Sequence, residues 1–171
     1  KTWEPFKKGL TSAAVHDLVI QEEEQHLLVG THGRSIYLAD IALIQNHDID
    51  NLLADIKIFD VKDLRFSERW GTKRSTDINY FTPSLKFPIF SKSSHKASFE
   101  IINNDKDVLF SQSISLDKGY NFIDYNLTIL DDANLDLYDK SQNGKYYLQK
   151  GDYSISIKTD NTTIVNQFKI K

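Results

Sequence analysis

Apolar and polar residues alternate with a period of two in the second half of the chain, a pattern typical of half-buried β-strands. The clearest runs are "SLKFPIF" at 84–90, "ASFEI" at 97–101 and "DYSISIK" at 152–158. Turn sequences such as "NNDKD", "LDKG" and "QNGK" separate the runs. Residues 82–171 are therefore predicted to form an immunoglobulin-like antiparallel β-sandwich of about seven strands.

One face of these strands forms the predicted core, which consists of Leu85, Phe87, Phe99, Ile101, Phe110, Phe122, Tyr153, Ile155, Ile157 and Phe168. Pro83 and Pro88 flank or interrupt the first strand. Proline cannot donate a hydrogen bond to a neighbouring strand, so this strand is predicted to lie at a sheet edge or to carry a bulge.

The first part of the chain contains three shorter apolar runs, "VHDLVI", "HLLVGT" and "SIYLAD". The polar clusters "QEEEQ" and "HGR" separate them, which favours a meander of three strands in residues 1–45. Residues 46–81 are predicted to be a linker with short helical turns, ending in the polar stretch "LRFSERWGTKRSTD". The chain as a whole is predicted to be all-β.

Composition excludes several classes of function. The chain has 171 residues, a net charge of -3 and no Cys. It therefore has no disulfide, thiolate metal site or cysteine nucleophile, and no sequence-wide basic field that would attract nucleic acid. No apolar run approaches the roughly 20 residues of a membrane span, so no membrane insertion is expected.

Both ends of the sequence resemble one known family. The opening "KTWEPFKKGL" resembles the end of an Asp-box, and "VHDLVIQEEEQHLLVGTHGRSIYLADI" resembles the last repeat of bacterial sortilin-like, BNR-repeat β-propeller proteins. These proteins are often labelled glycosyl hydrolases. The ending "QKGDYSISIKTDNTTIVNQFKIK" is similar to the final strands of the immunoglobulin-like domain that commonly follows such propellers.

The resemblance implies an architecture and a location. Residues 1–45 would be a partial propeller blade of three to four strands, and the remainder of the parent propeller, upstream of Lys1, would be its partner. An extracellular, periplasmic or cell-surface location is also implied.

The stretch "THGR" has two interpretations. As an active site, it would use His32 as a general base and Arg34 as an oxyanion or carboxylate clamp, with Asp17 or Asp40 orienting the imidazole. As a structural turn, Gly33 would supply a positive φ, while Thr31, His32 and Arg34 would close the turn by hydrogen bonds and pairing. The structural interpretation is favoured because no nucleophile in a Gly-x-Ser-x-Gly context accompanies it.

Two further stretches are candidate ligand sites. In "RFSERWGTKR", Arg65, Arg69 and Trp70 could clamp and stack on an anionic or sugar ligand, and the alternative is a linker packed by its aromatic residues against the sandwich.

The stretch "DDANLDLYD" has the alternate acidic spacing of a calcium loop. It lacks the glycine and the bidentate glutamate of an EF-hand, so a solvated loop is favoured. No catalytic residue, metal site or cofactor is therefore predicted.

Two functional hypotheses remain. The first is a non-catalytic accessory or interaction module of a secreted propeller protein, contacting protein or glycan. The second is a piece of a glycoside hydrolase whose active site lies in the propeller. Glycoside hydrolysis generally needs two facing carboxylates, and the acidic residues here cluster in turns such as "QEEEQ". The first hypothesis is therefore favoured.

Overall fold

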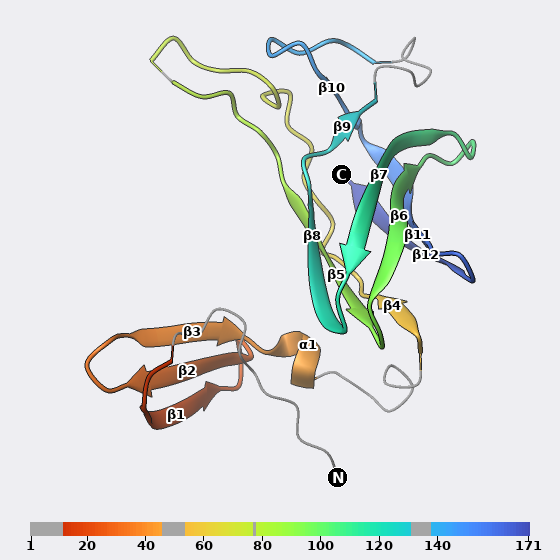
Figure 1. The fold of residues 1–171 in the computed structure, drawn as a ribbon. Coiled ribbons are helices and arrows are strands. Elements are labelled where there is room, and N and C mark those ends of the chain that lie inside the picture. The colour runs from red at the N-terminus through yellow and green to blue at the C-terminus, as the bar shows by residue number, and fades with distance from the viewer. Residues whose placement is uncertain (1–11, 46–53, 77, 131–137) are drawn as a thin grey trace. The chain divides into compact units, whose positions relative to one another are not determined.

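The computed structural model describes residues 12–45, 54–76, 78–130 and 138–171 (Figure 1). Its contacts divide the chain into two units, Lys1–Leu52 and Leu53–Lys171. Nearly all the regular secondary structure is antiparallel strand, so the all-β class predicted from the period-two pattern is confirmed.

The first unit contains one antiparallel sheet, in the order β1-β2-β3, followed by a single helical turn. Its elements are β1 (Val15–Gln21), β2 (His26–Thr31), β3 (Ile36–Asp40) and α1 (Ala42–Gln45). These are the three strands that the apolar runs predict, in the predicted meander. Short connections join the strands because only a few polar residues separate one apolar run from the next.

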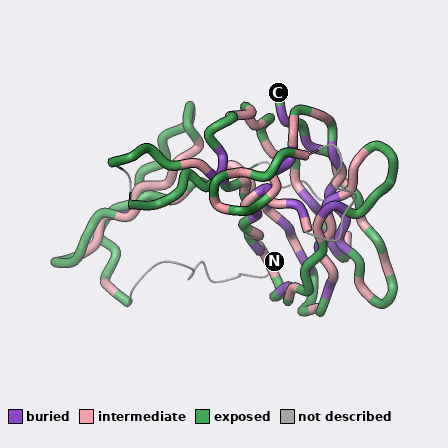
Figure 2. The backbone as a smooth tube through the Cα atoms, turned by 90° about the horizontal axis from the view of Figure 1, so that it is seen from above, coloured by how far each residue is buried: buried purple, intermediate pink, exposed green. Residues whose placement is uncertain are grey.

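The sheet of the first unit buries little of its apolar surface (Figure 2). Among residues 12–45 only Val29 and Ile41 are buried hydrophobics. The large apolar side chains that are at least half exposed are Val15, Leu18, Val19, Ile20, Ile36 and Leu38. The strands are thus held by pairing with their neighbours, without a core of their own among the described residues.

The second unit is built from two larger sheets and one short strand pair. The first sheet contains β4 (Ile56–Ile58), β5 (Leu85–Ser91) and β8 (Gly119–Tyr125), in that order. The second contains β12 (Thr163–Ile170), β11 (Gly151–Lys158), β6 (His95–Ile102) and β7 (Val108–Leu116). The short pair is β9 (Thr128–Ile129) with β10 (Tyr146–Tyr147).

The two larger sheets pack face to face as a β-sandwich. Phe87 of β5 contacts Phe99 of β6 and Phe168 of β12, with ring centroids 5.8 Å and 5.2 Å apart. In the constant-type immunoglobulin arrangement the fourth strand joins the sheet of the first, second and fifth. Here β7 is the fourth strand, counting β4 as the first, and it pairs with the third strand, β6, in the sheet that does not contain β4 and β5. The sandwich also begins before residue 82, because β4 pairs with β5.

Most of the predicted core is confirmed. The predicted residues that are buried are Phe87, Phe99, Ile101, Tyr153, Ile155, Ile157 and Phe168, and Leu85 and Phe110 pack against them half-buried. Phe122 was assigned wrongly, because it is 44% exposed. Its neighbours Asn121 and Tyr125 occupy the inward positions of β8, so the period-two register was misplaced by one residue on this strand.

The prediction that the first sandwich strand is an edge or bulged strand is wrong. β5 lies between β4 and β8 and pairs with β8 without a register shift. The Pro88 carbonyl faces β4 and accepts a hydrogen bond from Phe59 N at 3.1 Å. Proline has no N–H to donate in return, and β4 ends at Ile58, one residue before Phe59.

Tyr153 fixes the start of β11. Its hydroxyl donates a hydrogen bond to the Gln149 carbonyl at 3.0 Å, four residues upstream, as in the tyrosine corner of immunoglobulin-like sandwiches. Its ring stacks on Phe168 at 5.6 Å. Burial, with a smaller contribution from the nearby Tyr138, raises the pKa of Tyr153 to about 12.

The raised pKa of Tyr153 predicts a loss of stability in alkali. An unfolded tyrosine titrates near pH 10, so the neutral phenol stabilises the fold fully below about pH 10, and this contribution disappears as the pH rises through 12. We expect Tyr153→Phe to destabilise the protein by about 0.5–1.5 kcal/mol at pH 8, through loss of the hydroxyl bond. The gap between wild type and variant should narrow between pH 10 and 12 in urea unfolding. A gap independent of pH would contradict this assignment.

The position of Phe99 between the sheets predicts a large effect of truncation. Phe99→Ala should lower the free energy of unfolding by about 3–5 kcal/mol, because a cavity replaces a ring that is 1% exposed. Phe122→Ala is the matched control and should cost about 1 kcal/mol or less. Denaturant unfolding at constant slope measures both. Equal effects of the two substitutions would refute this core assignment.

Candidate functional site

The "THGR" stretch forms the turn between β2 and β3. Gly33 has a φ of 72°, as the structural interpretation predicts. Thr31 closes the turn, because its Oγ1 donates to the Ser35 carbonyl at 2.6 Å and accepts from Ser35 N at 3.0 Å. The structure thus supports the turn interpretation.

The residues of the catalytic interpretation do not assemble around His32. Asp17 Oδ1 accepts from Leu18 N, and Asp40 Oδ1 accepts from Ala42 N, each at 2.9 Å. Within residues 12–45, His32 makes its backbone bond to Ala14 and stacks its ring on His16. The described residues therefore contain no oriented Asp-His pair at this turn.

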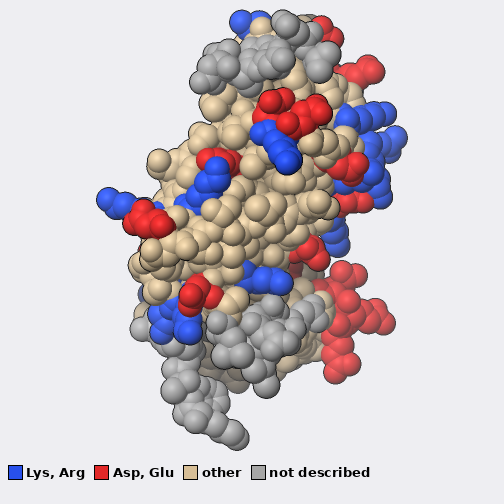
Figure 3. All heavy atoms as spheres, turned by 90° about the vertical axis from the view of Figure 1, so that its right-hand side faces the viewer, with Lys and Arg blue, Asp and Glu red and all other residues tan. Residues whose placement is uncertain are grey.

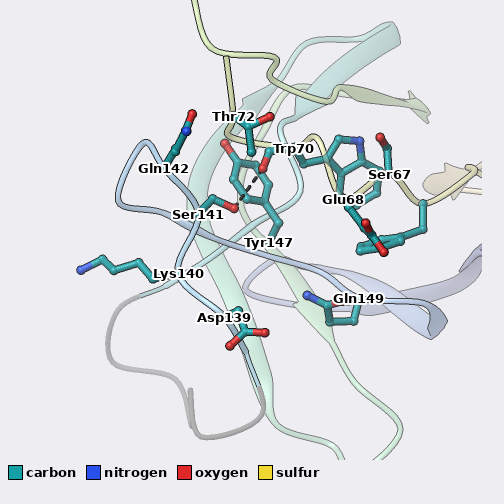
Figure 4. A pocket seen from close by; sticks show the side chains of 11 residues that line it. Ser67, Glu68, Trp70, Thr72, Asp139, Lys140, Ser141, Gln142, Tyr147 and Gln149 are labelled. Carbon is teal, nitrogen blue, oxygen red and sulfur yellow. Dashed lines mark hydrogen bonds between the residues drawn. The ribbon is translucent and has the colours of Figure 1, made fainter. Parts of the chain in front are cut away.

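A pocket of about 450 Å³ lies in the second unit, where the segment 66–72 meets the segment 139–149 (Figure 4). Three aromatic residues, Phe66, Trp70 and Tyr147, form its apolar wall. The polar residues that line it are Ser67, Glu68, Thr72, Asp139, Lys140, Ser141, Gln142 and Gln149. Figure 4 shows Lys140 extending away from the rings of Trp70 and Tyr147, and its ammonium lies 5.5 Å from the Tyr146 ring centroid.

Hydrogen bonds stabilise the two segments that line the pocket. Ser141 Oγ donates to the Trp70 carbonyl at 2.9 Å, and Asn143 N donates to the Gly71 carbonyl at 3.0 Å. Asn143 Nδ2 donates to the Tyr147 hydroxyl at 2.7 Å. Two of these hydrogen bonds join the segment 66–72 to the segment 139–149, and the third lies within the segment 139–149.

The close approach of the two segments depends on Gly71. This residue has a φ of +73°, and a Cβ built on it would lie 2.6 Å from the Tyr147 ring and 2.7 Å from the Ser141 Cβ. Any other residue would have to displace the segment 141–147 and would also strain its own backbone. Glycine is the residue that lets the two segments touch.

Of the three predicted ligand residues, only Trp70 lines the pocket. Trp70 is 4% exposed and packs edge-on against Phe66, with centroids 5.1 Å apart. Arg65 is exposed, and the Arg69 guanidinium lies 5.4 Å from the Phe81 ring centroid, so neither lines the pocket. The segment packs against the sandwich by its aromatic residues, as the alternative interpretation states.

Sequence reasoning missed Glu68, Asp139, Tyr147 and Gln149 as pocket residues. They come from segments about 70 positions apart, and no local spacing connects them. Asp132, Asn134 and Asp136 of the calcium-loop stretch lie outside the described residues. Among the described residues, no group of three or more His, Cys, Asp or Glu side chains is arranged to hold a metal ion.

Charges of both signs lie next to one another over much of the face in Figure 3. The second unit contains ion pairs such as Lys158 with Glu100 at 2.6 Å and Lys169 with Asp152 at 2.9 Å. No helix among the described residues is long and apolar enough to cross a membrane. Comparison with known proteins identified no family model that matches the chain and no similar curated protein.

The role of Gly71 gives a testable prediction. Gly71→Ala should destabilise the protein by about 2 kcal/mol or more, because it adds a steric clash to backbone strain. Gly144→Ala is the control. It has a similar φ of +77° but only Lys140 Cε near it, at 3.9 Å, so it should cost about 1–2 kcal/mol from strain alone. Thermal melts of the two variants measure the loss of stability. An equal loss in both would show that the steric clash at position 71 adds nothing to the backbone strain.

Proposed function

We propose that this chain is a non-catalytic accessory module of a secreted β-propeller protein and that it binds a neutral glycan in the pocket beside Trp70. The observation that carries the proposal is this pocket, whose volume of about 450 Å³ is typical of small-molecule sites. Its fixed wall, made by Ser141 and Asn143, supports binding with little reorganisation.

The lining of the pocket fits a sugar. Carboxylate, amide and hydroxyl groups, here from Glu68, Gln149 and Thr72, can pair with hydroxyl groups that both donate and accept. The aromatic wall offers apolar contact for the C–H face of a ring. Trp70 and Tyr147 are almost fully buried, so the aromatic wall exposes only a small apolar area, mainly from Phe66, and this favours one or two sugar units.

The first unit supports attachment to a larger β-structure. Its sheet exposes apolar residues such as Leu18 and Leu38, at 59% and 63%. Sheets in propellers cover such surfaces by packing blade against blade. The proposed partner is the remainder of a parent propeller. We propose an extracellular, periplasmic or cell-surface location, which the family resemblance supports.

The second candidate function, a part of a glycoside hydrolase, has one observation in its favour. Two carboxylates, Glu68 and Asp139, line the same pocket. A general acid in such enzymes is enclosed in an apolar setting, whereas both of these residues are exposed. Binding without hydrolysis is therefore the better-supported activity.

The proposal predicts glycan binding that depends on the pocket. The full chain should retain neutral oligosaccharides on a glycan array, with the affinity then measured by calorimetry. Gln149→Ala and Glu68→Gln should each weaken binding about 3- to 10-fold, as expected for one lost hydrogen bond. Gln167→Ala and Glu23→Gln change exposed residues that do not line the pocket, so they should leave the affinity unchanged.

Two outcomes would decide against the proposal. Binding that is equally strong in the pocket variants would place the ligand elsewhere, and no binding across the array would remove the glycan hypothesis. Turnover of aryl glycosides that Glu68→Gln abolishes, with an unchanged melting temperature, would instead favour the hydrolase.

A further inference from the structure

We propose that His16 and His32 form a binding site for a divalent transition-metal ion, with Zn²⁺ as the representative ion. The two imidazole rings lie nearly parallel, with centroids 4.9 Å apart and planes 21° from each other. His16 belongs to β1 and His32 to the β2–β3 turn. The site is thus confined to the first unit and is independent of the glycan pocket.

The backbone brings these two side chains together. Val15 pairs with Thr31 and Asp17 with Gly30, so the register shifts at His16 and leaves it as the extra residue of a bulge. A bulge re-aims the side chain of its extra residue. On the other side, His32 N donates to the Ala14 carbonyl at 2.9 Å, which holds the turn beside the start of β1.

The ring nitrogens are available as ligands. Both histidines are exposed, and within residues 12–45 no hydrogen bond to either ring nitrogen is found. Imidazole suits Zn²⁺, Cu²⁺ and Ni²⁺. With Zn–N bonds of about 2.0–2.1 Å, two ligating nitrogens lie about 3–4 Å apart. The two exposed rings are close enough for one ion, and both must turn out of the stack so that a nitrogen of each points at it.

The rest of the coordination sphere would be water. The neighbouring Asp17 carboxylate is directed to Leu18 N, and the Thr31 hydroxyl is directed to Ser35. A site with two protein ligands and open positions is accessible to an exogenous ligand, as in catalytic zinc sites, although here it has one protein ligand fewer. We expect moderate affinity and exchangeable metal.

The experiment is a titration of the full chain with Zn²⁺ alone. In nitrogen-detected NMR spectra of the imidazoles, the resonances of His16 and His32 should shift together and saturate at one equivalent. His26 of β2 and His95 of β6 are internal controls whose resonances should stay in place. Calorimetry should give an affinity that falls about tenfold or more in His16→Ala and in His32→Ala, because each removes a ligand. His26→Ala and His95→Ala should bind as the wild type does.

The outcome is decisive in both directions. Zinc affinity unchanged in His16→Ala and His32→Ala, or shifts that begin at His26 or His95, would overturn the site. Because His32→Ala can disturb the turn, His32→Gln serves as a second variant that keeps a polar side chain, with circular dichroism as the check on folding. The spectra of the unaltered chain test the proposal without any substitution.

Discussion

Contact between aromatic rings of the two larger sheets is the interaction on which the second unit depends. Phe87 and Phe99 meet between the sheets, and Phe99 also contacts Tyr125 at 5.9 Å. Each such ring buries a large apolar area and prefers tilted or edge-on geometry, which fixes how the sheets face one another. The core cluster also includes Ile56 and Ile58 of β4 and Phe168 and Ile170 of β12.

The segment 64–73 is the second structural constraint. Leu64 forms a parallel bridge with Ile170, and Phe66 N donates to the Lys171 carbonyl at 2.8 Å. The start of the segment therefore lies beside the C-terminal end of β12. It then buries Trp70 in the core. A stretch with the composition of a linker is therefore part of the sandwich, and the pocket forms where it meets the segment 139–149.

The two units differ in how their strands are stabilised. The sandwich has a continuous apolar core, whereas the first unit relies on hairpin pairing and leaves most apolar side chains of β1 exposed. The stacked rings of His16 and His32 are exposed on this unit and form no part of a core. The apolar side chains that the first unit exposes form the kind of surface that marks interaction sites in proteins.

The sequence by itself determined the strands, most of the core and the "THGR" turn, because these depend on local periodicity and on the freedom of Gly33 to adopt a positive φ. It misplaced Phe122 and the position of β5, because register and strand order depend on partners distant along the chain. Only the tertiary structure decided which residues share the pocket. Trp70 and Tyr147 are separated by many residues, and the close contact at Gly71 that joins their segments has no signature in the local sequence.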